Sequence, residues 1–204
     1  MMPVELYLGF VLATIIVVVV PGPSITVIVA NGAAHGIRAG LATVAGNTSG
    51  VAILLVALVA GFAPIMQAMS DWFGWLKLAG ALYLIWLGVS QWRASSKALV
   101  GITASRQAAG FFRQGFFVGM SNPKLLLFFA VFFPQFMDVG GNITSQLVVL
   151  AVSFLLVATM LDAGYALAAG RAGRWLSGRR ALLLNRFSGG VLVGGGLWLA
   201  LARR

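Results

Sequence analysis

The stretch Val17-Val18-Val19-Val20-Pro21-Gly22-Pro23-Ser24 decides how the rest of this chain is interpreted. It lies within an uncharged run from Leu6 to Ala30, which is long enough to cross a bilayer because a span takes about 20 apolar residues. Proline removes a backbone donor and clashes with the preceding turn, so the helix should break or kink at Pro21. Backbone groups freed by a break cannot face lipid, where each would cost several kcal/mol. The break therefore predicts a contact with protein or a water-filled cavity, as in transporter binding sites, with a packed structural kink as the alternative.

The composition is that of an integral membrane protein. Of the 204 residues, 60% are hydrophobic and 9% are charged, whereas a soluble domain carries about 25% charged residues. The apolar runs are continuous rather than alternating, which predicts an all-α fold. A net charge of +10 could indicate nucleic-acid binding, but the basic residues lie between apolar runs, where positive-inside topology accounts for them. The chain has no cysteine and one histidine, His35, so we expect neither disulfides nor a metal site nor a cofactor.

Six membrane spans are predicted, and these are Leu6–Ala30, Gly40–Ala63, Trp72–Gln91, Phe112–Phe136, Thr144–Ala169 and Ala181–Ala202. Lysine and arginine gather around the third and fifth connections, the first contains Arg38, and residues 64–71 and 137–143 contain neither. The positive-inside rule then places the first, third and fifth connections in the cytoplasm and both termini outside. Arg203 and Arg204 favour a five-span alternative, in which the C-terminus lies inside.

A weak internal repeat divides the chain into two halves. The fourth span contains a second polar break, Ser121-Asn122-Pro123-Lys124, and the third and sixth spans each open with a cation followed by a glycine. An odd number of spans per half requires the second half to be inverted in the membrane. We therefore expect one transporter domain over 1–204, built of two inverted three-helix repeats at about 1–92 and 112–204 joined by a cytoplasmic connection at about 93–111. In such folds the substrate binds between the halves, and in this chain the broken helices are expected to be the first and the fourth.

Three polar residues lie inside the predicted spans, where a charge costs about 2.5–3.5 kcal/mol on insertion scales. Asp162 is the only carboxylate deep in a span, which favours a proton carrier or an acceptor for a substrate amine; its alternative role is a structural partner of Lys124. Lys124 follows Pro123 at the second break and could meet that carboxylate, or it could extend to the headgroups. Asn47 could bond to backbone freed at the first break, or join two helices.

Several motifs together resemble the LysE/RhtB family of amino-acid exporters. They are Pro21-Gly22-Pro23 with a small polar residue after it, the glycine-rich second span, Asn122-Pro123-Lys124 followed by Pro134-Gln135-Phe136, and Asp162 with Tyr165. The family often has asparagine where this chain has Ser24, a difference that bears on substrate selection. The resemblance implies export of amino acids or close derivatives, either homoserine-, threonine- or lysine-like or neutral, driven by the proton motive force across a bacterial cytoplasmic membrane.

The sequence thus predicts a transporter and not an enzyme, since no nucleophile–base pair lies within the spans. The expected partners are a small amino-acid substrate, protons and the lipid bilayer, without nucleic acid, and a homodimer is left open. The alternatives are a transporter of another small solute or cation, and a membrane assembly protein that transports nothing. The predicted substrate-binding residues are Pro21, Gly22, Pro23, Ser24, Asn47, Asn122, Pro123, Lys124 and Tyr165, and the predicted proton-coupling residue is Asp162.

Overall fold

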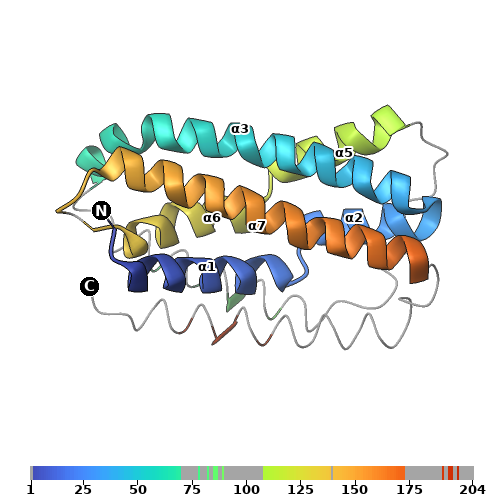
Figure 1. The fold of residues 1–204 in the computed structure, drawn as a ribbon, viewed down its shortest axis with the longest axis horizontal. Helices are drawn as coiled ribbons and strands as arrows, with labels where there is room; N and C mark the ends of the chain where they lie inside the picture. Colours follow the sequence, from blue (N-terminus) through green and yellow to red (C-terminus); the bar gives the residue numbers. More distant parts are fainter. Residues whose placement is uncertain are drawn as a thin grey trace.

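The computed structural model of the chain describes residues 2–69, 108–138 and 140–172, together with isolated positions elsewhere. Within these ranges the regular structure is entirely helical (Figure 1). Its elements are α1 (Val4–Val19), α2 (Pro23–His35), α3 (Ile37–Met69), α5 (Ala108–Met120), α6 (Pro123–Phe132), the 3-10 helix η2 (Phe133–Phe136) and α7 (Ile143–Ala172). The all-α prediction is confirmed. The predicted third and sixth spans lie outside the described residues, apart from a few positions.

The predicted breaks in the first and fourth spans are both present. Helix α1 ends at Val19 and α2 begins at Pro23, and the two axes are bent by 53°. In the second half the bend between α5 and the segment that begins at Pro123 is 40°. In both cases a proline occupies the first turn of the new helix, where its missing N–H costs nothing. By length and composition each bent pair can form one membrane span, and α3 and α7 can each form another.

The first connection differs from the prediction. The sequence predicts that residues 31–39 link two spans, but α2 continues to His35 and α3 starts at Ile37. The turn is made at Gly36 alone, with φ 86°, a conformation that is costly for any residue with a Cβ atom. Only Gly36 separates the two helices, so the link is shorter than the predicted one.

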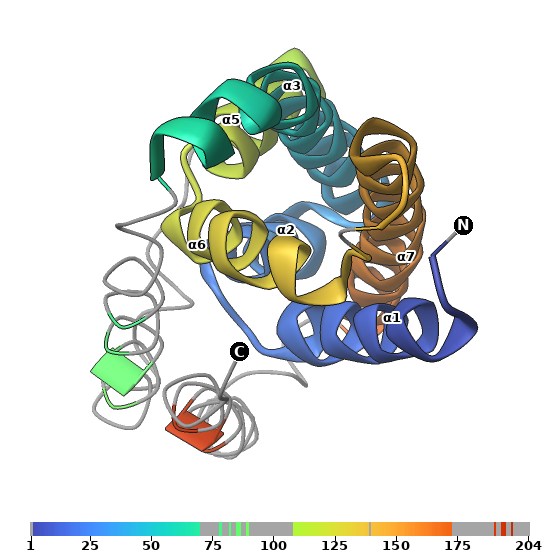
Figure 2. The same ribbon diagram turned by 90° about the vertical axis from the view of Figure 1, so that its left-hand side faces the viewer.

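Helices α3 and α5 pack with their backbones in direct contact. Glycines face each other across this pair: Gly46 and Gly50 on α3, Gly115 and Gly119 on α5. A Cβ atom added at Gly46 would overlap the carbonyl of Phe112. Close packing of this kind holds membrane helices together by van der Waals contact. Figure 2 shows the half-helices α2 and α6, which follow the two breaks, inside an arc formed by α3, α5, α7 and α1.

A cluster of phenylalanines fills the bundle at the end where α1 begins. Phe10 of α1 contacts Phe133 at 5.3 Å between ring centroids, and Phe129 of α6 contacts Phe154 of α7 at 4.7 Å. By contrast, large apolar side chains are exposed on the outer faces of α1 and α7, for example Leu8 and Leu156. Exposed apolar surface of this extent is typical of helices that face lipid. The interior at this end of the bundle is therefore filled by packed aromatic side chains.

Candidate functional site

The two helix breaks come together at a hydrogen bond between residues 98 positions apart. Asn122 donates from Nδ2 to Ser24 Oγ at 3.0 Å, and both side chains are buried. The Oδ1 atom of Asn122 accepts at 3.1 Å from the backbone N–H of Lys124, so this side chain also caps the N-terminus of α6. One asparagine thus fixes the start of α6 and joins it to the start of α2. The structure brings the two predicted breaks to one place at the centre of the bundle.

The Lys124 ammonium group binds the end of α1. Its Nζ donates to Val17 O at 2.9 Å and to Val20 O at 2.8 Å, and the side chain is 4% exposed. These carbonyls are free because the helix stops before Pro21 and its last carbonyls lack intrahelical donors. Gly22 leaves room for this arrangement, since a Cβ atom there would lie 3.0 Å from Nζ. Lys124 therefore points into the protein, and the alternative in which it extends to the headgroups is wrong.

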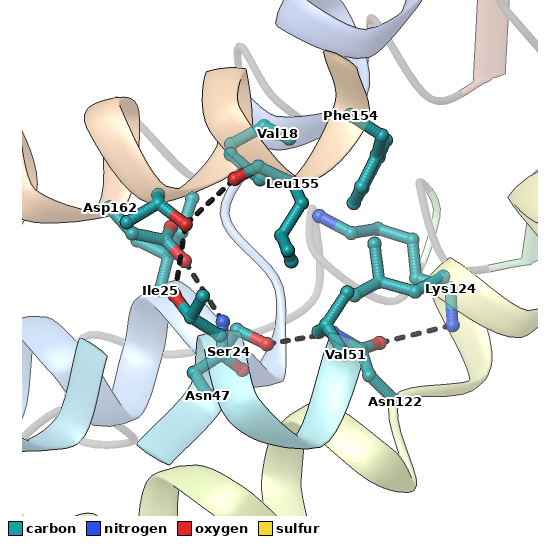
Figure 3. Close-up of a pocket in the computed structure, with 14 residues that line it drawn as sticks. Val18, Ser24, Ile25, Asn47, Val51, Asn122, Lys124, Phe154, Leu155 and Asp162 are labelled. Carbon is teal, nitrogen blue, oxygen red and sulfur yellow. Dashed lines mark hydrogen bonds between the residues drawn. The ribbon is translucent and has the colours of Figure 1, made fainter. Parts of the chain in front are cut away.

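Asp162 lies in the middle of α7 and is 4% exposed. Its Oδ2 accepts a hydrogen bond from Asn47 Nδ2 at 2.9 Å, so Asn47 joins α3 to α7 rather than bonding to the first break. The Oδ1 atom of Asn47 is buried without a hydrogen-bond partner among the described residues. The direct Asp162–Lys124 pair considered from the sequence is not formed in this conformation. Figure 3 shows instead that the two side chains enter from opposite sides, Lys124 from α6 and Asp162 from α7.

A small cavity separates the two charged groups. Its volume is about 20 Å³, which is room for a water molecule and not for an amino acid. The polar part of its wall consists of Ser24, Asn47, Thr48, Asn122, Lys124, Thr159 and Asp162. The apolar part consists of Val18, Ile25, Val51, Leu125, Phe154, Leu155 and Ala158. The site is therefore closed in this conformation, and a solute larger than water requires the helices around it to separate.

Other residues predicted to bind substrate lie at the edge of the site. The Tyr165 hydroxyl donates to Val19 O at 2.9 Å and does not line the cavity, so its role here is to hold the end of α1. The prolines and Gly22 shape the breaks without lining the cavity. Thr48 and Thr159 do line it, with their hydroxyl oxygens 3.0 Å apart, and the sequence analysis missed both. Their positions gave a signal, since Thr48 adjoins Asn47 and Thr159 lies one turn before Asp162 on the same helix face.

The wall of this cavity carries one basic and one acidic side chain. A buried cation and a buried anion face each other across it, and the rest of its wall is neutral. Among the described residues no group of three or more His, Cys, Asp or Glu side chains could hold a metal ion. A single buried carboxylate beside an asparagine is a weak ligand set for a metal cation.

Comparisons with known proteins identify the relatives of this chain. The family model described as LysE type translocator matches residues 15–203. A homoserine/homoserine lactone efflux protein of Salmonella typhimurium is 32% identical over 204 residues, covering 99% of both chains. A leucine efflux protein of Klebsiella pneumoniae is 28% identical over 158 residues, which are 76% of this chain and 72% of that protein. An uncharacterized membrane protein of Vibrio cholerae is 27% identical over 99% of this chain and 100% of its own length. No solved structure matches the chain.

Proposed function

Because this chain belongs to the LysE type translocator family, we propose that it exports amino acids or close derivatives from the cytoplasm. The observation that carries the proposal is the pair of buried charges, Lys124 and Asp162, on opposite sides of a cavity where two broken helices meet. Broken helices at the centre of a membrane bundle are where secondary transporters bind their substrates. The efflux function in the names of two relatives supports the same class. We place the protein in the cytoplasmic membrane of a bacterium.

An amino acid is a zwitterion, and the two sides of the cavity suit its two charges. The substrate carboxylate is assigned to the Lys124 side, where the ammonium group lies next to Gly22 at the N-terminus of α2. Helix N-termini present free N–H groups and favour negative charge. The carbonyls at the end of α1 could have served the substrate ammonium, but they already accept hydrogen bonds from Lys124. We therefore assign the substrate ammonium to Asp162, with Asn47 holding the carboxylate in position.

On this proposal, a proton and the substrate ammonium compete for Asp162, and this competition couples export to the proton motive force. The ionised carboxylate attracts a substrate ammonium, and protonation of the same group removes that attraction. A proton and a substrate therefore exclude each other from the site. If the protein changes conformation only when one of the two is bound, substrate moves outward as protons move inward. The closed cavity of the present conformation fits a step of such a cycle in which no substrate is bound.

The test is transport by the purified protein in proteoliposomes, first with a panel of labelled amino acids and then with a pH gradient. Asp162→Asn keeps the shape of the side chain and removes its charge, so it should abolish gradient-driven export. Asp162→Glu should retain part of it, since the carboxylate remains. Asp138→Asn is the matched control, because Asp138 lies in the link before α7, outside the cavity, and it should transport normally.

Two outcomes contradict the proposal. Full gradient-driven export by Asp162→Asn would assign coupling to another group. A wild-type protein that transports no amino acid of the panel would favour another solute, or an assembly role without transport.

A further inference from the structure

Lys124 carries one more proton than its hydrogen bonds use. An ammonium group has three N–H donors, and two of them donate to Val17 O and Val20 O at 2.9 and 2.8 Å. Among the described residues no acceptor takes the third. The side chain is buried and lines the central cavity. Because a neutral amine keeps two N–H donors, Lys124 can release one proton and still donate to both carbonyls of α1.

The Asp162 carboxylate has an oxygen that is free to accept. Its Oδ2 bonds to Asn47 Nδ2, and among the described residues no group donates to Oδ1. Two nearby groups are unsuitable as proton donors. The amide of Asn47 does not release a proton in water at ordinary pH, and the Tyr165 hydroxyl directs its proton to Val19 O. In the described part of the chain, the remaining route for a proton to Asp162 is through the cavity.

One water molecule fits between the two groups. The cavity volume of about 20 Å³ exceeds the 10–15 Å³ or so that a water needs. A cation there would be repelled by Lys124 and an anion by Asp162, whereas a water accepts from the first and donates to the second. Ser24 also lines the cavity, and its hydroxyl proton has no acceptor among the described residues. These three groups satisfy the two to four polar partners that a buried water takes.

We propose that Lys124 is the proton donor to Asp162 and acts through one water molecule bound in this cavity. The inference rests on the proposed function, which makes Asp162 the coupling group. One N–H bond of Lys124 breaks as the water takes that proton, and the water passes one of its own protons to Asp162 Oδ1. The products are a neutral amine, a water and a carboxylic acid. A proton from the outer solution then restores the ammonium, so the net change is one proton on Asp162.

The transfer needs no movement of the helices. Before it, Lys124 donates to the water and the water donates to Asp162. After it, the acid donates to the water and the water donates to the amine, so each hydrogen bond keeps its two partners and reverses its direction. The step also converts two buried charges into neutral groups inside the membrane, where a charge is costly.

Lys124→Arg tests the donor. Arginine keeps the positive charge and the N–H donors for α1 but does not give up a proton. For a labelled amino acid that the wild type transports, we compare export driven by a pH gradient with counterflow, an exchange without net proton movement. Lys124→Arg should lose gradient-driven export and retain part of the counterflow, so the ratio of the two rates falls. The ratio corrects for any loss of substrate binding.

A second measurement follows the water and requires no transport. Infrared difference spectra of the purified protein between acidic and alkaline buffer are recorded in ordinary water and in water labelled with oxygen-18. Wild type should show a water O–H band that shifts with the label and a carboxylic-acid band that is lost in Asp162→Asn. Ala158→Val enlarges a side chain of the cavity wall and should remove the water band. Ala168→Val, on the exposed face of the same helix, is the matched control and should keep it.

An unchanged ratio in Lys124→Arg, or the absence of the water band from wild type, would overturn the relay and leave export and its coupling at Asp162 intact. If Lys124→Arg loses counterflow as well, the infrared comparison decides, and a water band that survives in Ala158→Val would overturn the site. Full gradient-driven export by Asp162→Asn would overturn the proposed coupling and the relay together.

Discussion

Gly115 tests whether the backbone contact between α3 and α5 holds the protein together. A Cβ atom at this position would overlap the carbonyl oxygen of Thr43 and lie 2.9 Å from the backbone nitrogen of Asn47. Both atoms belong to the main chain of α3, so no side-chain rotation relieves the clash and the two helices must move apart. We therefore expect Gly115→Ala to be destabilised by the usual cost of overpacking, about 1–3 kcal/mol.

Gly164 supplies the matched control, because a Cβ atom there meets nothing within 4 Å. Both substitutions replace glycine by alanine within a helix and gain about 0.5–1 kcal/mol of helix propensity. This gain cancels in the comparison, so the difference in unfolding free energy between the two variants, about 1–3 kcal/mol, isolates the contact. The assay is unfolding in mixed micelles with increasing sodium dodecyl sulfate, followed by far-ultraviolet circular dichroism. Equal midpoints for the two variants would refute the argument that α3 and α5 touch through their main chains.

Three further predictions concern topology, the first break and Lys124. Single cysteines introduced at Ser95 and Ser177, in connections rich in lysine and arginine that lie outside the described residues, should resist an impermeant thiol reagent added to intact cells; labelling of both would reverse the orientation. Replacing Pro21 and Pro23 together by alanine should restore a continuous helix and abolish export without loss of membrane insertion, and normal export by that variant would show that the break is structural. Lys124→Met should leave two buried carbonyls at the end of α1 without donors, lower the unfolding free energy by about 1–3 kcal/mol for each, and abolish export. Lys124→Arg should recover part of the stability in the same unfolding assay. Equal stability of Lys124→Met and wild type would contradict the hydrogen bonds assigned to Nζ.

The breaks could be predicted from the sequence because their cause is local. A proline within an apolar run interrupts the helix wherever the chain folds, and Pro21 and Pro123 both did so. The buried charges could be identified for a similar reason, since charge inside a span is costly and rarely accidental.

The partners of these charges could not be predicted in the same way. A carboxylate and an ammonium in one bundle suggested a direct pair. The prolines also indicate free carbonyls at the end of α1, but nothing in the sequence says which donor binds them. Lys124 bonds to those carbonyls, and Asp162 bonds to Asn47. Thr48 and Thr159 were missed because a threonine in a membrane helix normally satisfies its hydroxyl within its own helix. Thr48 instead contacts Thr159 of α7, and its place beside Asn47 was the one sign of this in the sequence.

The hydrogen bonds from Lys124 to α1 have a consequence for biosynthesis. The carbonyls of Val17 and Val20 receive their donor from a residue 107 and 104 positions later in the chain. When α1 and α2 leave the ribosome, that residue has not yet been synthesised, and the break must keep its carbonyls hydrated in the translocon or at the membrane surface. The hydrogen bonds that these carbonyls accept in the folded protein can form only after α6 has been made. The end of α1, which is made first, therefore depends for two of its hydrogen bonds on a residue of the second half of the chain.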